Sequence, residues 1–215
     1  MDFLWALAGI FATAFVVGLS GAMMPGPLLA VTVDESARRG AMTGPLLVLG
    51  HMMLESALVA AIAFGLATFL GNKLVIGSIG LAGGGVMCWM GQGMVRSART
   101  MSLRMEAEGP GRMNPVAAGI VVSLSNPYWT IWWATIGVGY VILGMRFGVP
   151  GLLAFFAGHI LSDFAWYTLV SVSVAKGKRF LSDRVYRTLI MLCGAALILF
   201  GLWFFRTGIE TVMGR

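Results

Sequence analysis

Two stretches of this chain share one pattern, Gly50-His51-Met52-Met53-Leu54-Glu55 and Gly158-His159-Ile160-Leu161-Ser162-Asp163. Each places an imidazole four residues before a carboxylate within a long apolar run, and residues four apart share one face of a helix. An ionisable side chain at the centre of a bilayer costs roughly 2.5–3.5 kcal/mol. Two copies of so unfavourable a pattern predict a polar site inside a membrane protein.

The apolar runs around these stretches are long enough to cross a bilayer. Hydrophobic residues make up 58% and charged residues 11% of the chain, whereas a soluble domain has about 25% charged residues. A membrane-spanning helix needs roughly 20 apolar residues. Six runs reach that length, at about 3–33, 45–70, 74–95, 115–143, 151–175 and 185–205. The sequence therefore predicts an all-α, polytopic membrane protein with six transmembrane helices.

The basic residues predict the orientation of the chain. Eleven of the 15 Lys and Arg residues fall in the first, third and fifth loops between the runs. Because positively charged loops stay cytoplasmic, we expect these three loops inside the cell and both termini outside, in a bacterial or archaeal plasma (inner) membrane. The net charge of +6 is then explained by topology and by the lipid bilayer as neighbour, not by nucleic-acid binding.

The chain divides into two halves of three runs, residues 1–106 and 107–215, within one integral membrane domain. In each half the first run has a proline break, the second carries the histidine–carboxylate motif, and the third has two glycines seven residues apart. Because three is an odd number, the second half must enter the membrane upside down. Inverted repeats of this kind are typical of secondary transporters.

The breaks Pro25-Gly26-Pro27 and Asn126-Pro127 predict an exposed helix end in each half. Proline removes a backbone hydrogen bond and clashes with the preceding turn, so a helix ends or kinks there. The helix that follows presents N–H groups to an anion, and Asn126 can cap one such helix. Aromatic side chains after the second break could attract an ammonium group. The predicted site residues are Pro25, Gly26, Pro27, His51, Glu55, Asn126, Pro127, Tyr128, Trp129, His159 and Asp163.

These features together resemble the LysE-type translocators of the LysE/RhtB superfamily, small six-span exporters of amino acids and related solutes. The resemblance covers essentially the whole chain. It is carried by Ser20-Gly21-Ala22-Met23-Met24-Pro25-Gly26-Pro27, Gly40-x3-Gly44, Glu55, Ser125-Asn126-Pro127 and Asp163. It implies export coupled to a proton or ion gradient. The chain departs from the family at Glu55, usually aspartate, at His51, usually apolar or small, and at Tyr128, often lysine.

We therefore expect a secondary transporter, and not an enzyme, that exports an amino acid or a related amine- or carboxylate-bearing solute without a cofactor. The helix ends would hold a carboxylate, while Glu55 and Asp163 would hold an ammonium group or carry protons. His51 and His159 would exchange protons, because imidazole titrates near physiological pH.

Two alternatives remain open at this stage. Imidazole and carboxylate groups together suit Zn, Ni, Co or Mn, so the chain could instead export a divalent metal, with His51, Glu55, His159 and Asp163 as ligands. The same four side chains could also form purely structural hydrogen bonds between helices. The glycine-rich third run favours close helix packing and is compatible with a homodimer.

Overall fold

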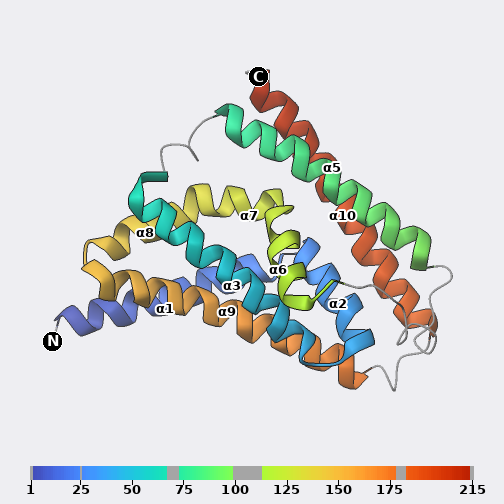
Figure 1. Cartoon of the computed structure of the whole chain (residues 1–215), viewed down its shortest axis with the longest axis horizontal. Helices are drawn as coiled ribbons and strands as arrows, with labels where there is room; N and C mark the ends of the chain where they lie inside the picture. Colours follow the sequence, from blue (N-terminus) through green and yellow to red (C-terminus); the bar gives the residue numbers. More distant parts are fainter. Residues whose placement is uncertain (1, 25, 67–72, 99–112, 178–182, 214–215) are drawn as a thin grey trace.

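The computed structural model describes residues 2–24, 26–66, 73–98, 113–177 and 183–213. Within these residues the regular structure is helical throughout (Figure 1). Five helices are long and apolar enough to cross a membrane, which confirms an all-α, multi-pass protein. They are α1 (Asp2–Ala22), α3 (Thr43–Ala61) with the short π-helix η1 (Ile62–Leu66), α5 (Lys73–Ala98), α9 (Gly148–Gly177) and α10 (Asp183–Val212).

The two proline breaks interrupt the first and fourth predicted runs. In the first, α1 ends at Ala22 and α2 (Pro27–Arg39) begins after the break, of which Pro25 lies outside the described residues. The fourth run is divided into α6 (Pro115–Leu124), α7 (Pro127–Trp132), the π-helix η2 (Trp133–Gly137) and α8 (Val138–Met145). No single piece of the fourth run reaches the length of a span, so a total of six transmembrane helices stays a prediction.

The helices that carry the two motifs, α3 and α9, run in opposite directions (Figure 1). Near the start of α3, Gly44 N donates a hydrogen bond of 3.1 Å to Ser171 Oγ near the end of α9. Near the end of α3, Val59 shares a buried cluster with Phe155 from the start of α9. The two histidine–carboxylate motifs therefore meet midway along both helices.

The glycine of each motif is a point of close helix approach. Gly158 faces the Phe11 carbonyl of α1, and Gly50 faces the Val116 carbonyl of α6. In both places a Cβ atom would overlap the neighbouring backbone. Small residues permit such close packing of helices in an apolar medium, so α1 lies along α9 and α6 lies along α3.

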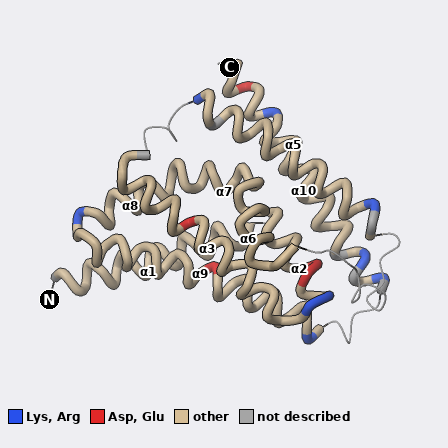
Figure 2. The backbone as a smooth tube through the Cα atoms, viewed as in Figure 1, with Lys and Arg blue, Asp and Glu red and all other residues tan. Residues whose placement is uncertain are grey.

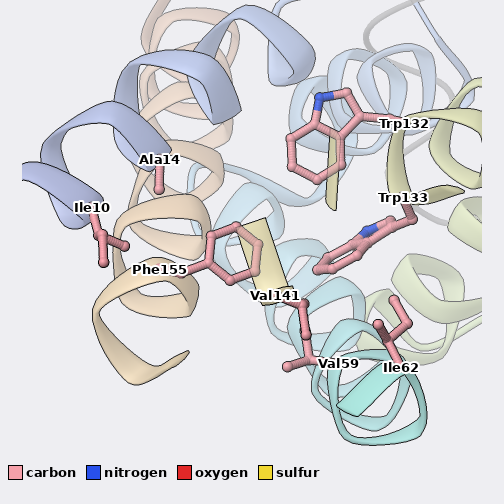
Figure 3. Close-up of a cluster of buried hydrophobic side chains, with 8 residues drawn as sticks. All are labelled: Ile10, Ala14, Val59, Ile62, Trp132, Trp133, Val141 and Phe155. Carbon is pink, nitrogen blue, oxygen red and sulfur yellow. The ribbon is translucent and has the colours of Figure 1, made fainter. Parts of the chain in front are cut away.

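A buried apolar cluster, shown in Figure 3, lies beside the two motifs, because its member Trp133 contacts both Glu55 and His159. Its members come from α1, α3, η1, α7, η2, α8 and α9, and they are Ile10, Ala14, Val59, Ile62, Trp132, Trp133, Val141 and Phe155. Trp133 and Phe155 are fully buried. The cluster excludes water from this side of the motifs, which strengthens electrostatic interactions beside it.

Helices α5 and α10 form an antiparallel pair that lies across one side of the central helices (Figure 1). Gly84 and Gly91 of α5 face the carbonyls of Gly201 and Gly194 of α10, respectively. The glycine pairs seven residues apart therefore serve a contact within the chain. The homodimer stays a prediction.

Basic side chains mark one end of several helices. Arg38 and Arg39 lie in the last turn of α2, Arg96 in that of α5 and Lys176 in that of α9. These helix ends and the start of α10 lie toward the same side of the molecule (Figure 2). Arg184 and Arg187 lie in the first turns of α10, whereas the other basic residues of the third and fifth loops lie outside the described residues, namely Arg99, Arg104, Arg112, Lys178 and Arg179.

The contact between α5 and α10 predicts a stability difference between two adjacent glycines. A Cβ at Gly84 would lie 2.7 Å from both Gly201 O and Phe205 N. Overpacking of this kind costs about 1–3 kcal/mol, so Gly84→Ala should lower the melting temperature of the detergent-solubilised protein. The control is Gly85→Ala, because a Cβ there meets nothing within 4 Å. Equal melting temperatures for the two variants would contradict this packing.

Candidate functional site

The two motifs bring their four ionisable side chains into one buried cluster, which we call the charged centre (His51, Glu55, His159 and Asp163). None of the four is more than 6% exposed. His51 Nε2 lies 3.0 Å from Glu55 Oε1, and His159 Nε2 lies 3.0 Å from Glu55 Oε2. Each Nε2 also lies 3.7 Å from Asp163 Oδ2. The two imidazoles thus bridge the two carboxylates.

Two tryptophans add to the surroundings of Glu55. The indole Nε1 atoms of Trp129 and Trp133 donate to Glu55 Oε1 at 2.9 and 2.8 Å. These residues are four apart, across the junction of α7 and η2, and so share one face. With the two imidazoles, Glu55 has four donors around its two oxygens. An ionised carboxylate only accepts hydrogen bonds, so these donors fit the charged form of Glu55.

Asp163 has quite different surroundings. It is 4% exposed, yet its Oδ2 has no hydrogen-bond partner among the residues that the structure describes. Its neighbouring basic atoms are the two imidazole Nε2 atoms, both beyond hydrogen-bond distance at 3.7 Å. The two motifs therefore match in sequence, but one carboxylate is held by many donors and the other is not.

His51 has a partner on its second ring nitrogen. Its Nδ1 lies 2.7 Å from Ser123 Oγ, which also lies 2.6 Å from Gly119 O. A hydroxyl group has a single proton. When Ser123 donates it to Gly119 O, Nδ1 donates to Ser123 while Nε2 donates to Glu55, and His51 is doubly protonated. When His51 is neutral with its proton on Nε2, Ser123 donates to Nδ1. Ser123 can therefore support both protonation states of His51.

His159 has aromatic neighbours instead. Its ring stacks on Trp132, with centroids 4.6 Å apart and planes at 23°. Its Nδ1 is buried without a hydrogen-bond partner in the described part of the chain. A Cβ at Gly18 of α1 would lie 3.0 Å from this atom. Among the residues that the structure describes, no side chain supports Nδ1 of His159 as Ser123 supports that of His51.

A cavity of about 50 Å³ adjoins the charged centre. This space can hold a few water molecules. Besides the charged centre, it is lined by Gly18, Gly21, Ala22, Leu28, Ser123, Asn126, Tyr128, Trp129, Trp132 and Tyr167. Asp163, whose Oδ2 has no hydrogen-bond partner among the described residues, therefore borders a space that could admit a polar ligand.

The two helix breaks lie against each other beside this cavity. A Cβ at Gly26 would lie 3.4 Å from Asn126 Nδ2. The predicted cap is confirmed, because Asn126 Oδ1 accepts a hydrogen bond of 3.1 Å from Tyr128 N at the start of α7. Gly26 precedes α2, whose first turn receives no side-chain cap. Leu28 of that turn lines the cavity, so an uncapped helix end borders the same space as Asp163.

Most of the predicted site residues come together here. The charged centre, Asn126, Tyr128 and Trp129 line the cavity, and Gly26 lines an adjoining one. Pro27 and Pro127 are buried at the helix starts without lining either cavity, and Pro25 lies outside the described residues. The structure adds Ser123, Trp132 and Trp133, which the sequence analysis did not select. The spacing of Trp129 and Trp133 was the available signal.

An interrupted pair of apolar helices around buried ionisable groups defines a membrane transporter. The chain belongs to the family of LysE type translocators, whose model matches residues 19–208. It is 26% identical over 209 residues to YcgF of Bacillus subtilis (strain 168), named provisionally as an amino acid efflux protein, covering 95% of this chain and 99% of that one.

Two further relatives differ in the functions that their names state. The chain is 28% identical over 195 residues to the chemotactic transduction protein ChpE of Pseudomonas aeruginosa, covering 89% of this chain and 95% of that one. It is 26% identical over 174 residues to the threonine efflux protein of Escherichia coli (strain K12), covering 75% and 80%. No solved structure matches the chain.

The tryptophan contacts with Glu55 predict that Trp133→Phe destabilises the protein. The change keeps a ring in a fully buried position but deletes the donor at 2.8 Å from Oε1. A hydrogen bond to a charged group contributes about 1.5–3 kcal/mol, so the melting temperature in detergent should fall. The control is Trp89→Phe, since Trp89 is 74% exposed. A Trp133→Phe variant as stable as this control would show that the contact contributes nothing.

Proposed function

We propose that this translocator exports an amino acid, or a related small solute with an amine or carboxylate group, and that export is coupled to a proton or ion gradient. The observation that carries the proposal is the charged centre, in which two distant motifs meet beside two broken helices. Buried ionisable groups in an apolar bundle mark substrate or proton pathways. The names of the efflux proteins among the relatives support the same substrate class.

The substrate is held at both ends of its zwitterion. Its ammonium group binds Asp163 Oδ2, the buried carboxylate oxygen that has no hydrogen-bond partner in the described chain. Its carboxylate binds the N-terminal turn of α2, because helix N-termini attract anions and no side chain caps this one. Asp163 and Leu28 of that turn line one cavity, which is why one molecule can reach both.

The two carboxylates have different roles in this proposal. Glu55 is the permanent counter-ion of the two imidazoles, fixed by the indoles of Trp129 and Trp133. Asp163 is the exchanging group, which binds either the substrate cation or a proton. His51 supplies the second protonation site, because Ser123 can accommodate it in either state.

The inverted repeat, with halves 1–106 and 107–215, accounts for this arrangement. Gly50 packs on Val116 as Gly158 packs on Phe11, and α3 and α9 are antiparallel, as two inverted copies require. The pieces α6 to α8 together form the fourth of six spans, which is broken in its middle. Orientation follows the basic loops, with the ends of α2, α5 and α9 cytoplasmic in the inner membrane and both termini outside.

The proposal is tested with purified protein in proteoliposomes and a panel of leucine, threonine, lysine and glutamate, with and without a pH gradient. Asp163→Asn should abolish gradient-driven transport and keep the wild-type melting temperature, because it neutralises a buried charge. Glu55→Gln should lower both transport and melting temperature, because it removes the charge of the carboxylate that lies 3.0 Å from both imidazoles.

The matched control is Glu210→Gln, since Glu210 is an exposed acid that pairs with Arg206 on α10. It should change neither transport nor stability. Transport at the wild-type rate by Asp163→Asn would overturn the proposal. Transport lost equally in both variants, with equal melting temperatures, would refute only the division of roles between Glu55 and Asp163.

A divalent cation is the second candidate substrate, because one ligand atom from each of His51, Glu55 and Asp163 lies within 4.8 Å of the others. The indole hydrogen bonds to Glu55 Oε1 compete with metal binding there, which favours the first candidate. The same vesicles loaded with a metal-sensitive dye test it with zinc, nickel and manganese. Metal flux that collapses in His51→Gln and His159→Gln, with no amino-acid transport, would establish the second candidate instead.

A further inference from the structure

A second cavity, of about 30 Å³, lies next to the one at the charged centre. The two cavities share five lining residues, Gly21, Leu28, Asn126, Tyr128 and Tyr167. Beyond this shared neck the walls of the second cavity are formed by Met24, Gly26, Met87, Phe200 and Phe204. We call this space the apolar chamber. None of the described residues that line it is charged.

The apolar chamber lies where the pair of α5 and α10 meets the helix breaks. Met87 comes from α5, Phe200 and Phe204 from α10, and Met24 from the first break. Met87 and Phe204 are 1% and 3% exposed and belong to one buried cluster with Phe200 and Tyr128 at its edge. The chamber is therefore walled by the protein core and not by the outer surface of a helix.

We propose that the apolar chamber receives the side chain of the exported solute, and that the solute is an amino acid with an aliphatic side chain. The inference rests on the proposed function, which places the ammonium group on Asp163 and the carboxylate at α2. Gly26, which precedes α2, lines the chamber. A side chain attached to a backbone held at these two points therefore has the chamber next to it.

The chemistry of the walls selects against charged side chains. A buried charge without a partner is strongly unfavourable, and the chamber offers no charged partner among its described residues. Its polar side chains, Asn126, Tyr128 and Tyr167, lie at the shared neck, toward the substrate backbone. An aliphatic side chain loses no hydrogen bonds on entering and gains contacts with methionine and phenylalanine.

The chamber must widen to hold an aliphatic side chain as large as that of leucine. Methionine side chains suit such a change, because they are unbranched and repack easily. Met24 and Met87 form two of its walls. Gly21 and Gly26 also line the chamber and contribute no side chain to its volume. We therefore expect selection mainly by polarity, with leucine and methionine both accepted.

The test compares side chains in one transport assay. Wild-type protein in proteoliposomes should transport leucine at a rate at least about tenfold higher than threonine, lysine or glutamate. Tenfold is the lower end of the discrimination that an apolar pocket achieves between substrates that differ by a small group. A binding assay provides a second readout. Leucine should change the intrinsic tryptophan fluorescence of the detergent-solubilised protein, because Trp129 and Trp132 line the adjoining cavity, whereas lysine and glutamate should not.

The variant Met87→Gln keeps the length of the side chain but adds an amide to the chamber. It should reduce the leucine-to-threonine preference by about tenfold. The matched control is Met90→Gln on the same helix, since Met90 is partly buried but lines neither cavity. If Met87→Gln fails to fold, Phe200→Ala serves instead. It enlarges the chamber and should shift the preference from leucine toward phenylalanine.

The outcomes separate this inference from the function on which it rests. Preferred transport of lysine, glutamate or threonine over leucine would overturn the apolar chamber as the side-chain site and leave amino-acid export standing. An unchanged preference in both Met87→Gln and Phe200→Ala would also overturn it. Transport of no amino acid at all would overturn the proposed function and this inference together.

Discussion

The carboxylate of Glu55 and its four donors are the interaction on which the rest of the structure depends. A buried charge in an apolar interior is tolerated only when it is paired and hydrogen-bonded. Its donors come from α3 itself, α9, α7 and η2, so these elements must meet at one point. The close approaches at Gly50 and Gly158 press α6 and α1 against the same two helices. The apolar packing of the bundle and its polar centre are therefore satisfied by one arrangement.

The hydrogen bonds to Glu55 also leave the two motifs, which share one sequence pattern, with unequal surroundings. Once Glu55 has taken the hydrogen bonds of both imidazoles, Asp163 stays buried without a hydrogen bond from the described residues. The same imbalance appears in the imidazoles, because His51 has Ser123 and His159 has Trp132. A transport site needs a fixed part and an exchangeable part. Unequal surroundings for two matching carboxylates provide both without any additional charged residue.

The helix breaks connect this centre to the space where a solute could bind. Irregular backbone within an apolar bundle is tolerated where it lines a cavity or is covered by protein, and both conditions hold here. Gly26 and Asn126 lie next to each other at the cavities, and the pair of α5 and α10 covers them from the other side. Gly83 of α5 takes part in this cover, because a Cβ there would lie 2.8 Å from Pro127 Cδ. The α5–α10 pair thus covers the helix breaks and forms one wall of the apolar chamber.

The sequence alone determined the features that depend on local chemistry. Apolar length predicted the long helices, proline predicted the two breaks, and the side chain of Asn126 predicted a cap that the structure confirms. The tertiary structure decided which distant faces meet. The convergence of His51 and Glu55 with His159 and Asp163, the indole donors to Glu55 and the division of the fourth run at η2 could not be deduced from spacing. Periodicity fixes which residues of one helix share a face, whereas the partner of that face is chosen by packing and charge compensation among segments more than 70 residues apart.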